Sequence, residues 1–111
     1  MKIASAKAKG KALCLQVVSD LLRTLRLFPD DVRDPPGSVG GEDIWLSQRA
    51  REAFPYSIEC KNKERLNIWN ALKQAEANAT HSPMVVFKRN RSKIYVALEW
   101  DVFLGLYTKN E

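Results

Sequence analysis

The chain is poor in the residues that hold small folds together covalently or through zinc. Its 111 residues include two cysteines, Cys14 and Cys60, and one histidine, His81. No cysteines or histidines have the close spacing of a zinc site, which excludes a zinc-stabilised fold. Apolar neighbours around both cysteines favour a reduced protein. His81 lies just before Pro83 in an expected loop, and we assign it no role.

Long hydrophobic runs are also missing. No segment approaches the roughly 20 apolar residues that a membrane-spanning helix needs. The first residues are basic and small and precede no apolar stretch of the kind found in secretory signals. We therefore expect a protein that is neither secreted nor inserted in a membrane, located in the cytoplasm of a bacterial, archaeal or phage-infected cell. Residues 1–8 are expected to form a basic, flexible tail.

Positive charge exceeds negative charge along the chain. Eighteen lysines and arginines against thirteen acids give a net charge of +5, which favours a polyanionic partner such as nucleic acid. With 45% apolar residues, the whole chain, 1–111, is expected to form one domain with a single core. Each cluster of cations, taken alone, also fits a solvated surface. The residues predicted to contact DNA are Lys9, Lys11, Arg33, Ser38, Lys88, Arg89, Arg91 and Lys93.

Hydrophobic periodicity predicts an alternation of helices and strands. A helix is expected over residues 9–27, ended by Pro29, followed by a Pro- and Gly-rich mobile loop. The remaining expectations are a short strand around Val32, a strand over 42–47, a polar link over 47–52, a strand over 56–61, a helix over 64–79, strands over 84–88 and 93–98 joined by a turn, and a helix over 99–107. We expect Trp69 to pack against the sheet edge. The last helix is expected to pack in the core or, as a second choice, in a dimer contact.

The polar residues of two strands carry the chemistry. Side chains of a strand alternate between its faces, so Glu59 and Lys61 share a face while Cys60 points into the core. If strand 42–47 pairs with this strand, the carboxylate of Asp43 converges on that of Glu59. Two carboxylates and the backbone carbonyl of Cys60 are oxygen ligands that suit a hard divalent cation. Lys61 is then placed to orient or deprotonate water, or to stabilise charge on a phosphate. A plain ion pair between Glu59 and Lys61 on a half-exposed strand is the structural alternative.

The order of these elements resembles the PD-(D/E)xK nuclease superfamily. The resemblance covers roughly residues 9–98: Gly-Glu-Asp-Ile, a linker, Ile-Glu-Cys-Lys-Asn, and a helix containing Gln74. It implies an α/β fold with a restriction-endonuclease-like core, α-β-β-β-α-β, in which helices flank a central mixed sheet. By position, Asp43 and Glu59 correspond to the metal-binding acids and Lys61 to the catalytic lysine. Gln74 corresponds to the polar residue on the second helix of the resolvase-like branch.

The same resemblance implies the activity and its partners. It implies an endonuclease that uses Mg²⁺, with Mn²⁺ able to substitute, and leaves a 5′ phosphate. The similarity to Holliday-junction resolvases and small phage endonucleases implies branched DNA as substrate and a homodimer that cuts two strands. Resolvase-like members usually carry a glutamate on the first helix, and the nearest candidates here are Gln16 and Asp20. Three alternatives stay open: a nicking or repair endonuclease on flaps or duplex, a non-catalytic DNA-binding module with the same fold, and, last, a phage assembly protein.

Overall fold

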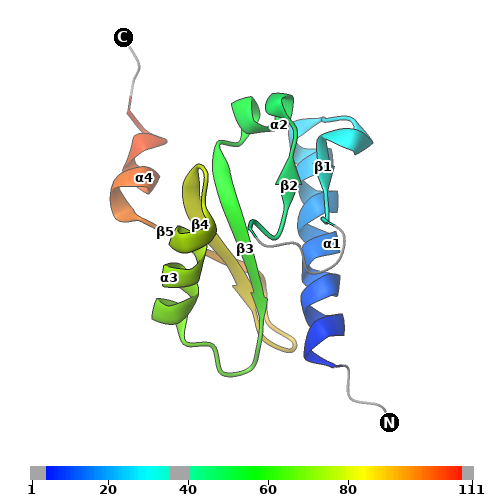
Figure 1. The fold of residues 1–111 in the computed structure, drawn as a ribbon, viewed down its shortest axis with the longest axis vertical. Helices are drawn as coiled ribbons and strands as arrows, with labels where there is room; N and C mark the ends of the chain where they lie inside the picture. The colour runs from blue at the N-terminus through cyan, green and yellow to red at the C-terminus, as the bar shows by residue number, and fades with distance from the viewer. Residues whose placement is uncertain (1–4, 36–40, 109–111) are drawn as a thin grey trace.

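A mixed sheet with helices on both sides forms the centre of the molecule (Figure 1). The computed structural model describes residues 5–35 and 41–108, so Ser38 lies outside the described residues. In chain order, the elements are α1 (Ala6–Leu25), the 3-10 turn η1 (Pro29–Asp31), β1 (Val32–Arg33), β2 (Trp45–Leu46), α2 (Gln48–Ala53), β3 (Tyr56–Asn62), α3 (Ile68–Asn78), β4 (Ser82–Lys88), β5 (Tyr95–Leu98) and α4 (Trp100–Gly105). The predicted α/β class with a mixed sheet flanked by helices is confirmed.

Helix α1 begins and ends earlier than its hydrophobic pattern suggested. The Ser5 hydroxyl accepts a hydrogen bond from the Ala8 N–H at 3.1 Å, which caps the first turn. Residues 6–8, expected in a flexible tail, therefore belong to the helix. At the other end Arg26 adopts a left-handed conformation (φ 54°) and its N–H bonds the carbonyl of Leu22. This cap, and not Pro29, ends the helix.

The sheet joins β3, β4 and β5 in that order. β3 runs parallel to β4, with α3 as the crossover, and β4 pairs antiparallel with β5. The expected pairing of strand 42–47 with the Glu59 strand is wrong in extent. β2 has two residues and pairs with β1 instead, and the segment just before it reaches β3 through one backbone hydrogen bond, from the Asp43 N–H to the Ile58 carbonyl at 3.0 Å.

Apolar side chains fill both sides of the sheet. On one side, Leu13 and Val17 of α1 pack against Ile58 and neighbouring residues. On the other side, Ala71 and Ala75 of α3 pack against Val85, and their small size lets this helix approach the sheet closely. As a result β3 is covered on both faces. Its polar face, which carries Ser57 and Glu59, is buried beneath α3 rather than half-exposed.

Three expectations for individual segments are wrong. The polar link over 47–52 contains helix α2, because the Ser47 hydroxyl caps it by accepting from the Ala50 N–H. Trp69 is 77% exposed and does not pack on the sheet edge. The residues expected to pack in the core from the last helix, Trp100, Phe103, Leu104 and Tyr107, are exposed, so the first choice of core packing fails for them, and α4 contacts the core through the partly buried Val102. Among the described residues, no helix is long and apolar enough to cross a membrane.

Candidate active site

Asp43 is attached to the open edge of β3 by two hydrogen bonds. Its N–H donates to Ile58, and its Oδ2 accepts from the Cys60 N–H at 2.8 Å. The N–H and carbonyl of one strand residue point to the same side of the strand. The Cys60 carbonyl therefore points to the edge that holds Asp43, which places two oxygen donors of the predicted metal site together.

Glu59 is buried on the adjacent face of the same strand, with 3% of its surface exposed. Burial is the largest influence that raises the pKa of this carboxyl, and the negative charge of Asp43 raises it further. Lys61 and Asn78 oppose this shift: the Lys61 Nζ lies 3.4 Å from Oε2, and the Asn78 amide donates to Oε1 at 3.5 Å. The charge of Asp43 thus raises the pKa of Glu59, and a cation between the two carboxylates would relieve their repulsion.

Lys61 is fixed between a strand and a helix. Its Nζ donates to the Gln74 Oε1 at 2.7 Å while it pairs with Glu59. Three predicted site residues, Glu59, Lys61 and Gln74, are therefore brought together by β3 and α3. Sequence reasoning gave Asn78 no individual role, although it lies one helical turn after Gln74 and so on the same face of α3.

These residues fit a hard cation that keeps several water ligands. The described residues contain no group of three or more His, Cys, Asp or Glu side chains that could hold a metal. A metal at this site would depend on the carboxylates of Asp43 and Glu59 and on the Cys60 carbonyl. Mg²⁺ is typically held by one or two carboxylates plus water, so this donor set suits it.

The side of α1 that faces Asp43 carries no glutamate, the residue that the resemblance to the resolvase-like branch implied on the first helix. Asp43 and Cys60 border a hollow of about 530 Å³ whose α1 wall includes Lys7, Lys11 and Cys14. Lys11 pairs with Asp34 across this hollow, and that contact raises the pKa of the lysine. The sequence candidates are elsewhere: Gln16 donates to Asp20 at 2.9 Å, and neither lines this hollow.

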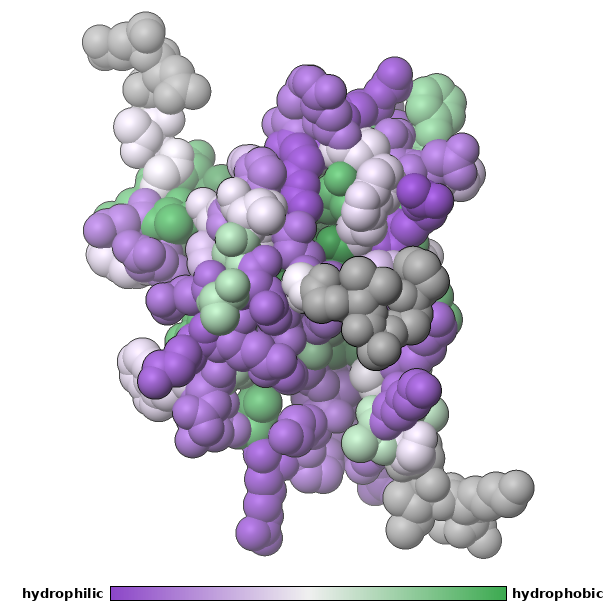
Figure 2. Space-filling model, in the orientation of Figure 1, coloured by the Kyte–Doolittle hydropathy of each residue, from purple (hydrophilic) through white to green (hydrophobic). Residues whose placement is uncertain are grey.

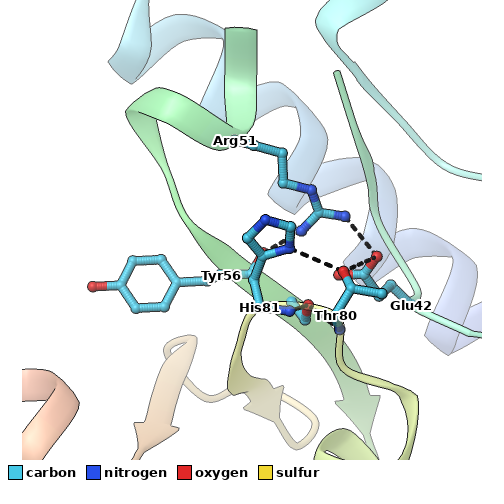
Figure 3. Close-up of polar contacts among 6 residues, drawn as sticks. Glu42, Arg51, Tyr56, Thr80 and His81 are labelled. Atoms are coloured by element: carbon cyan, nitrogen blue, oxygen red, sulfur yellow. Dashed lines mark hydrogen bonds and ion pairs between the residues drawn. The ribbon is translucent and has the colours of Figure 1, made fainter. Parts of the chain in front are cut away.

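A second polar network holds the segment that precedes Asp43 (Figure 3). The Arg51 guanidinium donates to Glu42 Oε1 at 2.5 Å and to the Tyr56 carbonyl at 2.9 Å, which ties α2 and residue 42 to the start of β3. Thr80 adds a bond to the same carboxylate oxygen at 3.5 Å. Burial acts to raise the pKa of Glu42, but hydrogen bonding and the charge of Arg51 lower it overall. Sequence reasoning missed both members of this pair; the available signal was the acidic Glu42 next to Asp43.

The predicted DNA-binding residues divide into those near the site and those apart from it. Lys88 and Lys93 line a hollow of about 500 Å³ together with Gln16 of α1 and Asn62 of β3. Arg89 and Arg91 belong to the same hairpin turn, and Asn62 donates to the Lys9 carbonyl at 3.1 Å. The Lys9 backbone and the basic hairpin turn therefore both lie at the carboxyl end of β3. Arg33 lies instead over the Trp45 ring, 4.4 Å from its centroid.

Comparison with known proteins identifies the family of the chain. A family described as phage putative PDDEXK endonuclease matches residues 6–111. No curated protein and no solved structure matches the chain. The family match covers nearly every described residue, including Asp43, Glu59, Lys61 and Gln74. The chain therefore belongs to the phage putative PDDEXK endonuclease family and, with it, to the PD-(D/E)xK nuclease superfamily.

Proposed function

We propose that this protein is a divalent-metal-dependent endodeoxyribonuclease whose active site consists of Asp43, Glu59, Lys61 and Gln74. The observation that carries the proposal is the meeting of Glu59, Lys61 and Gln74 beside the strand edge that binds Asp43. Mg²⁺, or Mn²⁺ in its place, would be held by Asp43, Glu59 and the Cys60 carbonyl. When bound, such an ion polarises the scissile phosphate and lowers the pKa of an attacking water.

Besides the metal ion, the proposed active site has one positively charged group of the protein, the ammonium of Lys61. Its ammonium group is held by a buried carboxylate and a neutral amide oxygen, so its position is defined before DNA binds. In this position it orients the attacking water or stabilises charge on the phosphate oxygens. Gln74 does not contact the phosphate in this account and acts through Lys61. It is a positioning residue for the reaction.

DNA binding is assigned to the basic end of the molecule. Lys88 and Lys93 line the hollow at the carboxyl end of β3, with Arg89 and Arg91 in the same turn and the Lys9 backbone bonded to Asn62. Lys11 borders the hollow beside Asp43. Together these cations would bring phosphate-binding charge toward Lys61. Arg33 would contact the backbone farther along, beside Trp45. Ser38 keeps its predicted role only as a proposal from the sequence, since it lies outside the described residues.

We propose branched DNA as the substrate. The enzyme would act on it in the cytoplasm of the host cell. Resolution of a four-way junction requires two symmetric cuts, and therefore a homodimer. A nicking or repair endonuclease would use the same site on flaps or duplex. The ion pair between Glu59 and Lys61 is also what a non-catalytic DNA-binding module would contain.

One cleavage experiment separates these functions. Purified protein is incubated with labelled four-way junction, flap and linear duplex, in Mg²⁺ or with chelator. We expect cleavage of the junction that requires the metal and is lost in Glu59→Ala and Lys61→Ala while DNA binding is retained. Preferred cutting of flap or duplex would favour the nicking enzyme. Binding without cutting, unaffected by Asp43→Ala, would overturn the nuclease proposal.

A further inference from the structure

A large apolar surface lies on the side of the molecule opposite α1. Helix α4 and the turn after it carry an aromatic row: the Trp100 and Phe103 rings are stacked 5.9 Å apart, and Phe103 and Tyr107 meet edge-on at 5.5 Å. Trp100 is 67% exposed and Tyr107 75%. In Figure 1 this helix projects beside the sheet, and Figure 2 shows hydrophobic side chains gathered over it on an otherwise mostly hydrophilic face. A folded chain rarely leaves so many aromatic groups in water without a partner.

The same surface contains a concave part next to the projecting row. A hollow of about 560 Å³ opens between α3 and α4, with apolar walls formed by Trp69, Leu72, Leu98 and Trp100. The projecting aromatic row and the apolar hollow lie side by side, so that the surface of one chain can fit that of a second copy. In a two-fold dimer, the aromatic row of each chain can enter the hollow of the other, which is the arrangement of an isologous interface.

Charge at this surface excludes DNA as its occupant. Lys73 lies at the rim of the hollow with Glu76 and Glu99, and Asp101 follows on the exposed face of α4. Three carboxylates and one lysine would repel a phosphate backbone, in contrast to the basic end of the molecule. Between two copies of the chain, the mixed signs allow Lys73 to face a carboxylate of the partner at the rim, where such pairs fix register.

We infer that Trp69, Trp100, Phe103, Leu104, Leu106 and Tyr107 form a self-association surface through which two copies of this chain make a symmetric dimer. Covering what these side chains leave exposed would bury roughly 700 Å² per chain, if each large side chain offers about 150–250 Å². A standard specific interface buries about 800 Å² per partner. The exposed area is thus close to that of a standard specific interface. The inference does not depend on nuclease activity, although a junction substrate would require such a dimer.

Sedimentation equilibrium of the full chain over a wide concentration range tests the inference. The wild type is expected to approach twice the monomer mass of 12.6 kDa. Trp69→Glu and Trp100→Glu should each weaken dimerisation by more than about tenfold, because central aromatic residues dominate interface energy. Leu15→Glu is the matched control, since Leu15 is also an exposed apolar residue (51%) but lies on α1. It should dimerise like the wild type.

Circular dichroism of each variant establishes that it is folded. Trp69 is 77% exposed on the surface of α3, so its substitution keeps the test available even if Trp100→Glu unfolds α4. A wild-type protein that stays monomeric at every concentration would overturn the inference. So would a dimer that both glutamate variants leave intact, or a monomer whose binding to single-stranded DNA is lost on replacing Trp69 and Trp100 by alanine.

Discussion

At the scale of single residues, Glu59 is held where its own charge destabilises the fold. Its carboxyl is buried, and burial together with the charge of Asp43 raises its pKa. A raised pKa in the folded state means that folding favours the protonated form. The contribution of Glu59 to the free energy of folding is most favourable below the unfolded-state pKa, near 4.3. It becomes less favourable as the pH rises through the folded-state pKa. A residue kept at such a cost fits a role in binding a cation.

Glu59→Gln is expected to raise the melting temperature at neutral pH while abolishing cleavage. The gain should be a few degrees, since about 1 kcal/mol shifts the melting temperature of such a domain by roughly 5 °C. The gain should shrink as the pH falls below about 4, where the wild-type carboxyl becomes protonated in both the folded and the unfolded state. Thermal unfolding across this pH range measures it. Glu76→Gln, on the exposed face of α3, is the control. A difference in melting temperature between Glu59→Gln and the wild type that grows as the pH falls would contradict the assignment.

Gln74→Ala is expected to slow cleavage by about 10- to 100-fold without weakening DNA binding. The substitution removes the amide that holds the Lys61 Nζ at 2.7 Å, and a displaced catalytic group loses rate at this scale. Single-turnover rates in Mg²⁺ and binding by fluorescence anisotropy in Ca²⁺ separate the two effects. Asn70→Ala removes an exposed amide from the same helix and should change neither. Equal losses in rate and binding would show that Gln74 contacts DNA.

At the scale of elements, the short helix α2 fixes the segment that carries Asp43. Arg51 of α2 joins Glu42 to the start of β3, and both side chains of the ion pair are about 15% exposed. Arg51→Ala leaves a mostly buried carboxylate without its cationic partner and is expected to cost about 3 kcal/mol of unfolding free energy. Urea unfolding measures this. Arg49→Ala, in which an exposed guanidinium 5.3 Å from the Phe28 ring is lost, should cost less than about 1 kcal/mol. Equal costs would contradict the structural role of the pair.

Most elements could be predicted from the sequence because their patterns are local. The long helix α1, strand β3 and the hairpin of β4 and β5 each follow a clear hydrophobic period, and the order of residues 43, 59, 61 and 74 led to the proposed site. The extent of β2 could not be predicted, because it depends on pairing with β1, which lies more than ten residues earlier in the chain. Helix α2 was missed because its six residues are mostly polar and depend on one serine cap.

The supporting residues of the site needed the fold as well as the pattern. Asn78 reaches Glu59, and Thr80 reaches Glu42, only because α3 and the loop after it return along β3. The exposure of α4 was unpredictable for the opposite reason. The spacing of its aromatic residues matches that of a helix packed in a core, and whether such a helix has a surface to pack against depends on the tertiary fold.

At the scale of the whole molecule, charge and apolar surface occupy different regions. The basic hairpin turn lies at the carboxyl end of β3, and the apolar surface lies over α4, where acids border it. Arg89→Ala and Arg91→Ala should each weaken DNA binding on all sequences and reduce the slope of log affinity against log salt by about 1. Anisotropy titrations over a salt series test this. Arg23→Ala, near the far end of α1, is the control, and an unchanged slope would exclude the hairpin from the DNA interface.

The central claim is that Asp43 and Glu59 together hold a divalent cation. Calorimetric titration of Mn²⁺ into the full chain tests it most directly, with wild type compared to Asp43→Asn, Glu59→Gln and the control Asp34→Asn. The account predicts saturable binding in the wild type and the control, and loss of that binding in both Asp43→Asn and Glu59→Gln. Undiminished binding in either of these two variants would contradict it.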